Sequence, residues 1–266
     1  MKSVITANGL EFATRQGKKI LAGVDVELQA GQILAVIGPN GAGKSTLFKL
    51  LSGEHEPAHG EVLLHGKLLD TYLKQDLAQI RVAMNQQFLI PFPLRVCEVA
   101  MMGRAPFFGW KETPRDFLVV DQALERIDMS EFRDRDYTSL SGGEKQRTQL
   151  ARALAQLEGT DGKLENKLLL LDEPSSALDL RHSHDVLKIC REVADRGAAV
   201  LLIIHDINMA LAHADEVLVL SDGRPRACGK VEEVLTESLV EEVFGVASRH
   251  LQPKGSGRGI FVHHLP

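Results

Sequence analysis

Short runs in which apolar and polar residues alternate fill the beginning of the chain. Two of them are 10–12 and 24–28, and glycines at positions 17, 23 and 31 mark the turns around these runs. A period of two is typical of strands that bury one face. We therefore expect the chain before residue 38 to form a small antiparallel sheet.

Three runs are apolar without interruption, at 33–37, 168–171 and 198–204. Such runs are typical of strands that are buried on both faces of a parallel sheet. Shorter candidate strands lie at 60–66 and 82–86. We expect the uninterrupted runs to build a mixed, mainly parallel core sheet.

The spacing of apolar residues becomes helical from Phe88 to about Leu157. The segment 117–127 predicts one amphipathic helix, and the apolar face of 144–157 predicts another. Prolines at 91, 93, 106 and 114 predict a loop at the entry to this region. We thus expect an α/β fold, with the antiparallel β subdomain first and an α-helical subdomain inserted into the core. The expected single domain, 1–266, divides into a core of 1–86 and 158–222, a helical subdomain of 87–157 and a C-terminal extension of 223–266.

Composition narrows the class of protein. With 266 residues and 44% hydrophobic content, the chain can bury a sizeable core. The formal net charge is −5 and the basic residues are scattered, so we expect no nucleic-acid partner. No run reaches the roughly 18 apolar residues of a membrane span, and we expect a cytoplasmic protein. The three cysteines lack any CxxC spacing, which argues against a disulfide framework or a zinc site.

The stretch GPNGAGKST at 38–46 lies between a strand-like run and a helix-like run. This is the setting of a phosphate-binding loop. Its glycines can adopt dihedral angles closed to other residues, so that consecutive N–H groups converge on an anion. We expect Lys44 to reach the β- and γ-phosphates and the Ser45 hydroxyl to coordinate Mg²⁺.

Polar side chains follow two of the buried strands. Asp172 and Glu173 end the first, and His205 ends the second. Ligands of parallel sheets bind beyond the carboxyl ends of the strands. We expect Asp172 to face the magnesium ion, Glu173 to polarise an attacking water and His205 to contact the γ-phosphate.

The sequence LSGGE at 140–144 opens the second predicted helix. Ser141 and Glu144 have the spacing of a capping box. A capping box does not explain Gly142 and Gly143, which weaken a helix start but leave backbone N–H groups open. Open N–H groups at a helix start suit a second phosphate contact.

These segments together resemble the nucleotide-binding subunits of ABC transporters, a family of P-loop NTPases. GPNGAGKST is similar to their Walker A loop, LSGGEKQR at 140–147 to their signature, LLLLDEP at 168–174 to their Walker B segment and SALD at 176–179 to their D-loop. Gln86 matches the Q-loop glutamine and His205 the switch histidine.

The resemblance implies ATP as the substrate, with Mg²⁺, bound between two copies of the chain arranged head to tail. Each ATP would contact the Walker A loop of one copy and the signature of the other, closing the dimer until hydrolysis reopens it. The implied catalytic residues are Glu173, His205 and Gln86, and the implied metal ligands are Ser45, Gln86 and Asp172. The implied nucleotide-binding residues are Gly38, Pro39, Asn40, Gly41, Ala42, Gly43, Lys44, Ser45, Thr46, Ser141, Gly142, Gly143, Glu144 and Asp179.

The resemblance also implies membrane partners. Permease subunits would dock near Phe88–Leu94, a periplasmic binding protein would act indirectly, and the chain would lie at the cytoplasmic face of the inner membrane. One departure from the family is Thr14-Arg15, where many relatives have an aromatic residue that stacks on adenine. Weak nucleobase selectivity is our hypothesis from this departure.

Two segments favour a cargo within the haem, vitamin B12 and iron-siderophore group of importers. The sequence FPLRVCEVAMMGRAP at 92–106 and the insertion Glu158–Asn166 resemble the haemin importers. A siderophore or vitamin B12 importer is the nearest alternative. A non-transport ABC ATPase is a more distant one, because such proteins usually carry coiled-coil arms or a second nucleotide domain. A P-loop kinase would give no reason for LSGGE.

Overall fold

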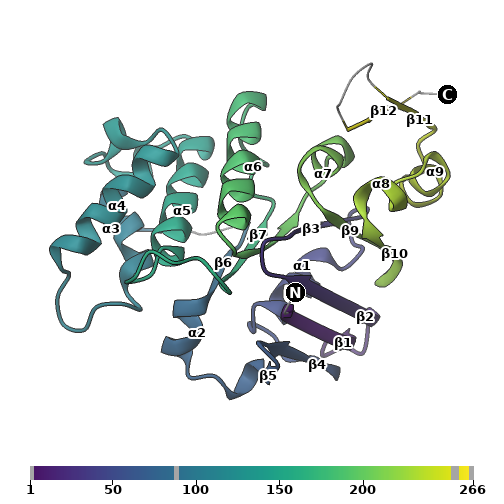
Figure 1. The fold of residues 1–266 in the computed structure, drawn as a ribbon, viewed down its shortest axis with the longest axis horizontal. Coiled ribbons are helices and arrows are strands. Elements are labelled where there is room, and N and C mark those ends of the chain that lie inside the picture. Colours follow the sequence, from purple (N-terminus) through teal and green to yellow (C-terminus); the bar gives the residue numbers. More distant parts are fainter. Residues whose placement is uncertain (1–2, 87–89, 253–257, 264–266) are drawn as a thin grey trace.

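The computed structural model describes residues 3–86, 90–252 and 258–263. Its centre is a six-stranded sheet in the order β10-β9-β3-β8-β7-β6, in which all neighbours are parallel except β10 and β9 (Figure 1). Every residue of β3, β7 and β8 is buried, which confirms the prediction from the uninterrupted apolar runs. The strands are β3 (Ile33–Ile37), β6 (Arg81–Met84), β7 (Leu168–Asp172), β8 (Ala199–Ile203), β9 (Glu216–Ser221) and β10 (Arg224–Lys230).

The alternating runs at the start of the chain form a second, antiparallel sheet in the order β2-β1-β4-β5, as predicted. Its apolar face packs with the first helix, α1, into a hydrophobic cluster that also includes residues of β3, β7 and β8. The second sheet therefore holds α1 in place against the central sheet. The elements are β1 (Ser3–Ala13), β2 (Lys19–Gln29), α1 (Lys44–Leu51), β4 (His59–Leu64) and β5 (Lys67–Leu68).

Helices α3, α4 and α5 lie together at one end of the molecule (Figure 1). Pro114 was expected in a loop but is the first residue of α4, where its missing N–H costs no helical hydrogen bond. Phe117 and Leu118 are on the outer face of α4, 47% and 57% exposed. The elements before and within this part are α2 (Lys74–Ile80), α3 (Val96–Met101), α4 (Pro114–Arg126), α5 (Gly142–Leu157) and 3-10 turns at Leu69–Thr71, Met102–Arg104, Ser130–Phe132 and Tyr137–Ser139.

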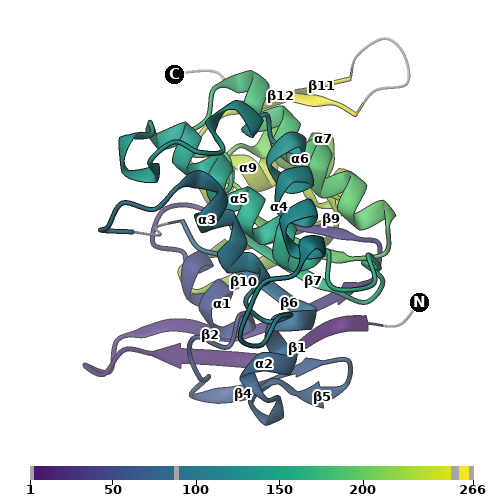
Figure 2. The same ribbon diagram turned by 90° about the vertical axis from the view of Figure 1, so that its left-hand side faces the viewer.

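The remaining helices cover the central sheet and lead to the C-terminal segment. The short helix α8 follows β10, and β12 pairs with β11 in a hairpin. Figure 2 shows this hairpin at the edge of the molecule beside α7. The sequence pattern missed α9. The elements are α6 (Leu180–Asp195), α7 (Ile207–His213), α8 (Val231–Val234), α9 (Glu237–Phe244), β11 (Ser248–Leu251) and β12 (Ile260–His263).

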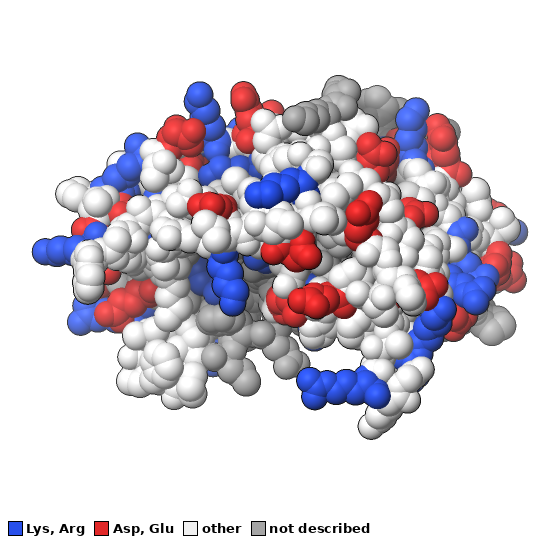
Figure 3. Space-filling model, turned by 90° about the horizontal axis from the view of Figure 1, so that it is seen from below, with Lys and Arg blue, Asp and Glu red and all other residues white. Residues whose placement is uncertain are grey.

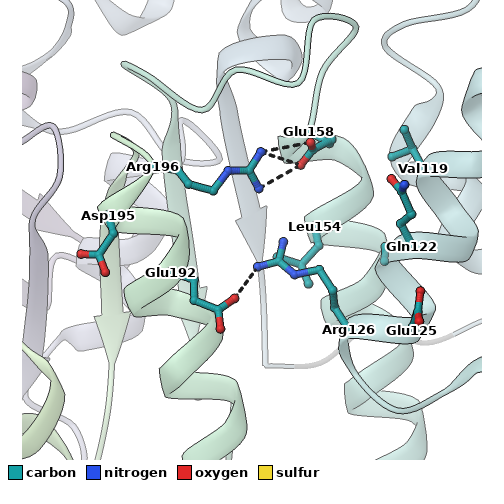
Figure 4. A pocket seen from close by; sticks show the side chains of 10 residues that line it. Val119, Gln122, Glu125, Arg126, Leu154, Glu158, Glu192, Asp195 and Arg196 are labelled. Carbon is teal, nitrogen blue, oxygen red and sulfur yellow. Dashed lines mark hydrogen bonds and ion pairs between the residues drawn. The ribbon is translucent and has the colours of Figure 1, made fainter.

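A cavity of about 640 Å³ lies where α4 and α5 meet α6 (Figure 4). Two ion pairs cross it. Arg126 Nη2 lies 2.9 Å from Glu192 Oε2, and Arg196 Nη2 lies 3.1 Å from Glu158 Oε1. Both pairs are partly exposed, so each contributes only about 0–1 kcal/mol. The ion pairs that join the helical part to the core beside this cavity are therefore weak.

Basic and acidic side chains are interspersed over the face in Figure 3. Within the ranges that the structure describes, no helix is both long enough and apolar enough to cross a membrane.

Candidate functional site

The loop 38–46 connects β3 to α1, so its predicted strand-loop-helix setting is confirmed. Gly38, Gly41 and Gly43 all have positive φ angles, of 153°, 82° and 99°. Two of them also lack room for a side chain. A Cβ on Gly38 would lie 2.1 Å from the carbonyl oxygen of Leu220, and one on Gly43 would lie 2.6 Å from Leu21 Cδ2. The loop conformation therefore requires glycine both for its dihedral angles and for its packing.

Lys44, the first residue of α1, is 6% exposed and reaches back across the loop. Its Nζ donates hydrogen bonds to the carbonyl oxygens of Gly38, at 2.8 Å, and Pro39, at 3.1 Å. Burial lowers the pKa of this amine, and the negative charges of Glu173 and Asp172 oppose that shift. The lysine is thus held on the side of the loop that faces these two carboxylates.

Asp172 ends β7 and is 5% exposed. Burial raises the pKa of its carboxyl, although a hydrogen bond with Ser45 and the charge of Lys44 act in the opposite direction. Its Oδ1 has no hydrogen-bond partner. A buried carboxylate oxygen without a donor is a fitting ligand for a hard cation. The structure therefore brings together Ser45 and Asp172, two of the residues predicted to hold Mg²⁺.

Glu173 follows β7 and is hydrogen-bonded to Gln86 and His205, the other two predicted catalytic residues. Gln86 Nε2 donates to Glu173 Oε2 at 2.5 Å, and His205 Nε2 is hydrogen-bonded to Glu173 Oε1. The side chains of Glu173 and His205 are 13% and 47% exposed. Gln86 follows β6 and His205 follows β8, the two neighbours of β7 in the sheet. The strand order therefore explains why residues far apart in sequence meet around one carboxylate.

The start of α5 has the predicted capping box. Ser141 N donates to Glu144 Oε2 at 2.7 Å, and Glu144 N donates to Ser141 Oγ at 3.3 Å. Among the hydrogen bonds of the described residues, none uses the N–H groups of Gly142 and Gly143, and none joins residues 141–144 to the loop 38–46. Within the described part of one chain, residues 141–144 therefore make no hydrogen bond to the loop 38–46.

Asp179 has a structural role in this chain. It is the N-cap of α6 and accepts hydrogen bonds at 2.9 Å from both the backbone N–H and Nδ1 of His182. The pKa of its carboxyl is lowered by these bonds. Its predicted contact with nucleotide stays a prediction.

The family model described as "ABC transporter" matches residues 21–176. The chain belongs to this ABC transporter family. It is an ATP-hydrolysing subunit of that family, and its fold is that of an ABC ATPase.

Individual relatives agree with this assignment. The hemin import ATP-binding protein HmuV of Streptomyces coelicolor is 43% identical over 86% of this chain and 79% of its own length. The HmuV protein of Pseudomonas aeruginosa is 45% identical over 87% of this chain and 89% of its own length. Among solved structures, an ABC transporter in an inward-facing conformation, described as of metal-chelate type, aligns with a TM-score of 0.81 and 30% identity over 100% of this chain and 98% of its own.

The position at which many ABC ATPases stack an aromatic ring on adenine holds the partly buried Thr14. The nearby Phe12 stacks on His55, with ring centroids 5.3 Å apart and planes 7° apart. Phe12 thus already has an aromatic partner within this ABC ATPase. The weak nucleobase selectivity that we infer from Thr14-Arg15 stays a prediction.

The expected docking segment of this ABC ATPase is only partly described, since Phe88 and Leu89 lie outside the described residues. Of the others, Ile90 is buried, Leu94 is half-buried and Phe92 is 52% exposed. Phe92 is therefore a side chain of this segment that is available to a partner.

Gln146 is a residue that sequence reasoning missed. Its Nε2 donates to the carbonyl oxygen of Glu173 at 2.7 Å, and its Oε1 accepts from the N–H of Ala177 at 2.9 Å. The sequence does place Gln146 one helical turn after Gly142, and therefore on the same side of the predicted helix. This position did not reveal which segment that side faces.

Proposed function

We propose that this chain is the ATP-hydrolysing subunit that powers a membrane importer of haem. The observation that carries the catalytic part is the convergence of the loop lysine, Asp172 and Glu173, with Gln86 and His205 hydrogen-bonded to Glu173. The names of relatives that are 43% and 45% identical support the cargo. The role of each residue follows from the chemistry of its position.

The loop 38–46 would bind the phosphates of ATP through its backbone N–H groups, and Lys44 would exchange its two carbonyl partners for phosphate oxygens. Glu173 would orient and polarise the attacking water. Its two oxygens are hydrogen-bonded, one to Gln86 and the other to His205. Each carboxylate oxygen has two lone pairs, so a water molecule could bind beside these partners and give its proton to the carboxylate. His205 is then placed to contact the γ-phosphate.

Mg²⁺ would be bound by Ser45, Asp172 and Gln86 together with phosphate oxygens. The described residues include no cluster of three or more His, Cys, Asp or Glu side chains that could hold a metal ion. Magnesium is suited to such a site because it commonly binds through one or two carboxylates, substrate phosphates and water. When bound, it would neutralise charge that develops on the phosphates.

Two copies would act together as a head-to-tail homodimer with an ATP molecule in each interface. The unused N–H groups of Gly142 and Gly143 support this arrangement, because one chain gives them no partner. In the dimer, residues 141–144 of one copy would contact the γ-phosphate held by the other copy. ADP lacks this phosphate, so ATP would close the dimer and hydrolysis would reopen it.

The dimer would bind permease subunits at the cytoplasmic face of the inner membrane, near Phe88–Leu94. Gln86 lies just before this segment and is hydrogen-bonded to Glu173. A movement of Glu173 at the nucleotide site would therefore be transmitted through Gln86 to the segment that contacts the permease. A periplasmic binding protein would deliver cargo to the same permease. The expected division into core, helical subdomain and C-terminal extension belongs to this proposal, with the helical subdomain moving relative to the core.

Haem is the proposed cargo, and an iron siderophore or vitamin B12 is the alternative. The likeness to a transporter described as of metal-chelate type, at 30% identity, supports the group as a whole, because haem is itself an iron chelate. The ATPase would not touch either cargo itself. Transport assays must therefore decide between them.

The test is reconstitution of the chain with its cognate permease in proteoliposomes. We expect ATP hydrolysis that the permease stimulates, haem uptake that needs ATP, and loss of both in Glu173→Gln, which keeps the fold but lacks the carboxylate. Uptake of a ferric siderophore or vitamin B12 in place of haem would reassign the cargo. Hydrolysis that the permease leaves unchanged would contradict the importer function.

A further inference from the structure

The side chain of Gln146 connects two parts of the chain that the proposed dimer assigns to different ATP molecules. It projects from the first turns of α5 to the turn that follows β7. Its amide spans this turn, with Nε2 donating to the carbonyl of Glu173 at 2.7 Å and Oε1 accepting from Ala177 N–H at 2.9 Å. Both partners are backbone groups, so the bonds fix the path of the chain and not the side chains.

The start of α5 and this turn are also in direct contact. A Cβ on Gly143 would lie 3.0 Å from the carbonyl oxygen of Ala177 and 3.4 Å from Leu178 Cδ2. The two segments thus lie close together at Gly143, and the helix start cannot move toward the turn without displacing it. A displacement of the helix start must therefore displace the turn, or break the two bonds of Gln146.

The backbone of Glu173 depends on such support. Its φ is 51°, in the left-handed region, which is unfavourable for a residue with a side chain. Its N–H donates to the carbonyl of Ile203 at 3.2 Å, and its carbonyl accepts from Gln146. The peptide groups on both sides of Glu173 are thus held, one by β8 and the other by α5. The direction of its carboxylate follows from these two bonds.

We propose that Gln146 is a positioning residue that couples the two ATP sites of the dimer. Through it, contact between the start of α5 and the γ-phosphate on the partner copy sets the backbone of Glu173, the base for the ATP of its own copy. This inference rests on the proposed function, because it needs a head-to-tail dimer. Because the turn carries the catalytic base, this coupling makes the rate of hydrolysis at one site depend on the ATP bound at the other.

The amide is suited to this role, because the turn offers one acceptor and one donor. Gln146→Met keeps the length of the side chain and removes both hydrogen bonds. Gln146→Glu keeps the acceptor for Ala177 but places a carboxylate oxygen against the carbonyl of Glu173. Gln156→Met is the matched control. Gln156 lies on the same helix and donates one amide hydrogen bond to the carbonyl of Ala78 at 2.7 Å, away from the turn.

The test measures ATP hydrolysis against MgATP concentration for the full transporter in proteoliposomes. Gln146→Met should lower kcat about tenfold, because the two lost bonds together would weaken the active geometry by about the net free energy of one hydrogen bond. The Hill coefficient should fall to about 1 and half-saturation should change less than about twofold, since residues of the loop 38–46 are untouched. Gln156→Met should keep the wild-type Hill coefficient and kcat.

ATP-dependent dimerisation provides a second measurement that does not depend on turnover. In the Glu173→Gln background, light scattering should detect ATP-bound dimers with or without Gln146→Met, which also shows that the variant is folded. If Gln146→Met does not fold, Gln146→Glu takes its place with the same expected results. A cooperative wild type whose variants keep its Hill coefficient would overturn the coupling and leave the proposed function intact. A wild type that hydrolyses ATP without cooperativity would also overturn the coupling, whereas one that neither dimerises with ATP nor hydrolyses it would overturn the proposed function.

Discussion

Replacing Arg104 by methionine tests the packing that fixes the helical part of the protein. The guanidinium is fully buried and joins segments that are distant in sequence. Nε donates to Asp116 Oδ1 at 2.9 Å, Nη1 to the carbonyl of Ala155 at 2.7 Å and Nη2 to the carbonyl of Gly159 at 3.0 Å. The same group lies 4.4 Å from the ring centroid of Phe107. One side chain thus holds α4, the end of α5 and the segment that follows it.

The expected loss of unfolding free energy is large because Asp116 would stay behind. This carboxylate is 3% exposed and would keep only the two hydrogen bonds from Thr113, at 2.9 Å from N and 2.6 Å from Oγ1. Breaking a buried ion pair from one side costs about 3–5 kcal/mol. At about 2–4 °C per kcal/mol for a chain of this size, the expected fall in Tm is roughly 6–20 °C.

Urea unfolding followed by circular dichroism measures this loss, with a fall in the midpoint at an unchanged m value. Arg133→Met is the exposed control. Arg133 Nε lies 2.8 Å from Asp121 Oδ1, but the two side chains are 38% and 49% exposed, so the control should lose less than about 1 kcal/mol. A loss within about 1 kcal/mol of wild type for Arg104→Met as well would refute this reasoning.

The double variant Arg104→Met, Asp116→Asn removes the stranded charge and keeps an acceptor for Thr113. It should regain much of the stability lost by Arg104→Met. Burial alone would raise the pKa of Asp116, but the hydrogen bonds from Thr113 and Arg104 outweigh it and hold this pKa below the ordinary value of 3.8. The ionised carboxylate therefore favours the fold above that value, and its contribution is lost as the pH falls through the folded-state pKa. The double variant should lack this part of the acid dependence.

Two further predictions concern the proposed function. Asp172→Asn removes a buried carboxylate whose pKa is raised by burial, and we expect the Tm of the nucleotide-free protein to rise by about 2–4 °C, the shift that roughly 1 kcal/mol produces. The rise in Tm on adding MgATP should be lost in the same variant, and a lower nucleotide-free Tm in differential scanning calorimetry would contradict this account. Phe92→Asp places a charge on an exposed residue of the expected docking segment, and stimulation of ATP hydrolysis by the permease should be abolished while basal hydrolysis persists. Unchanged stimulation would count against docking at this segment.

The elements that the sequence predicted well are those with a local pattern. Buried strands such as β3, β7 and β8 appear as unbroken apolar runs, and the loop 38–46 appears as glycines between a strand and a helix. Both signals come from residues that are close together in the chain. The capping box at Ser141 was predictable for the same reason.

Contacts between distant segments were beyond such patterns. The meeting of Gln86, Glu173 and His205 depends on the order of β6, β7 and β8, which the resemblance implied and no local period encodes. The buried position of Arg104 could not be predicted either, because arginine is rarely buried unless its partners are known. Pro114 was placed in a loop because proline both ends and begins helices, and the capping residue Thr113 was overlooked.

The two glycines at the start of α5 differ in what the chain itself explains. A side chain on Gly143 would press against the carbonyl of Ala177 at 3.0 Å, so packing within one chain already requires glycine there. A Cβ on Gly142 would meet only the Cβ of Ala177, at 3.9 Å, which is an ordinary contact. Gly142 is exposed, has a negative φ, and is a poor residue for a helix start. Nothing among the described residues requires glycine at this position, which supports the proposal that its N–H contacts the phosphate held by another copy.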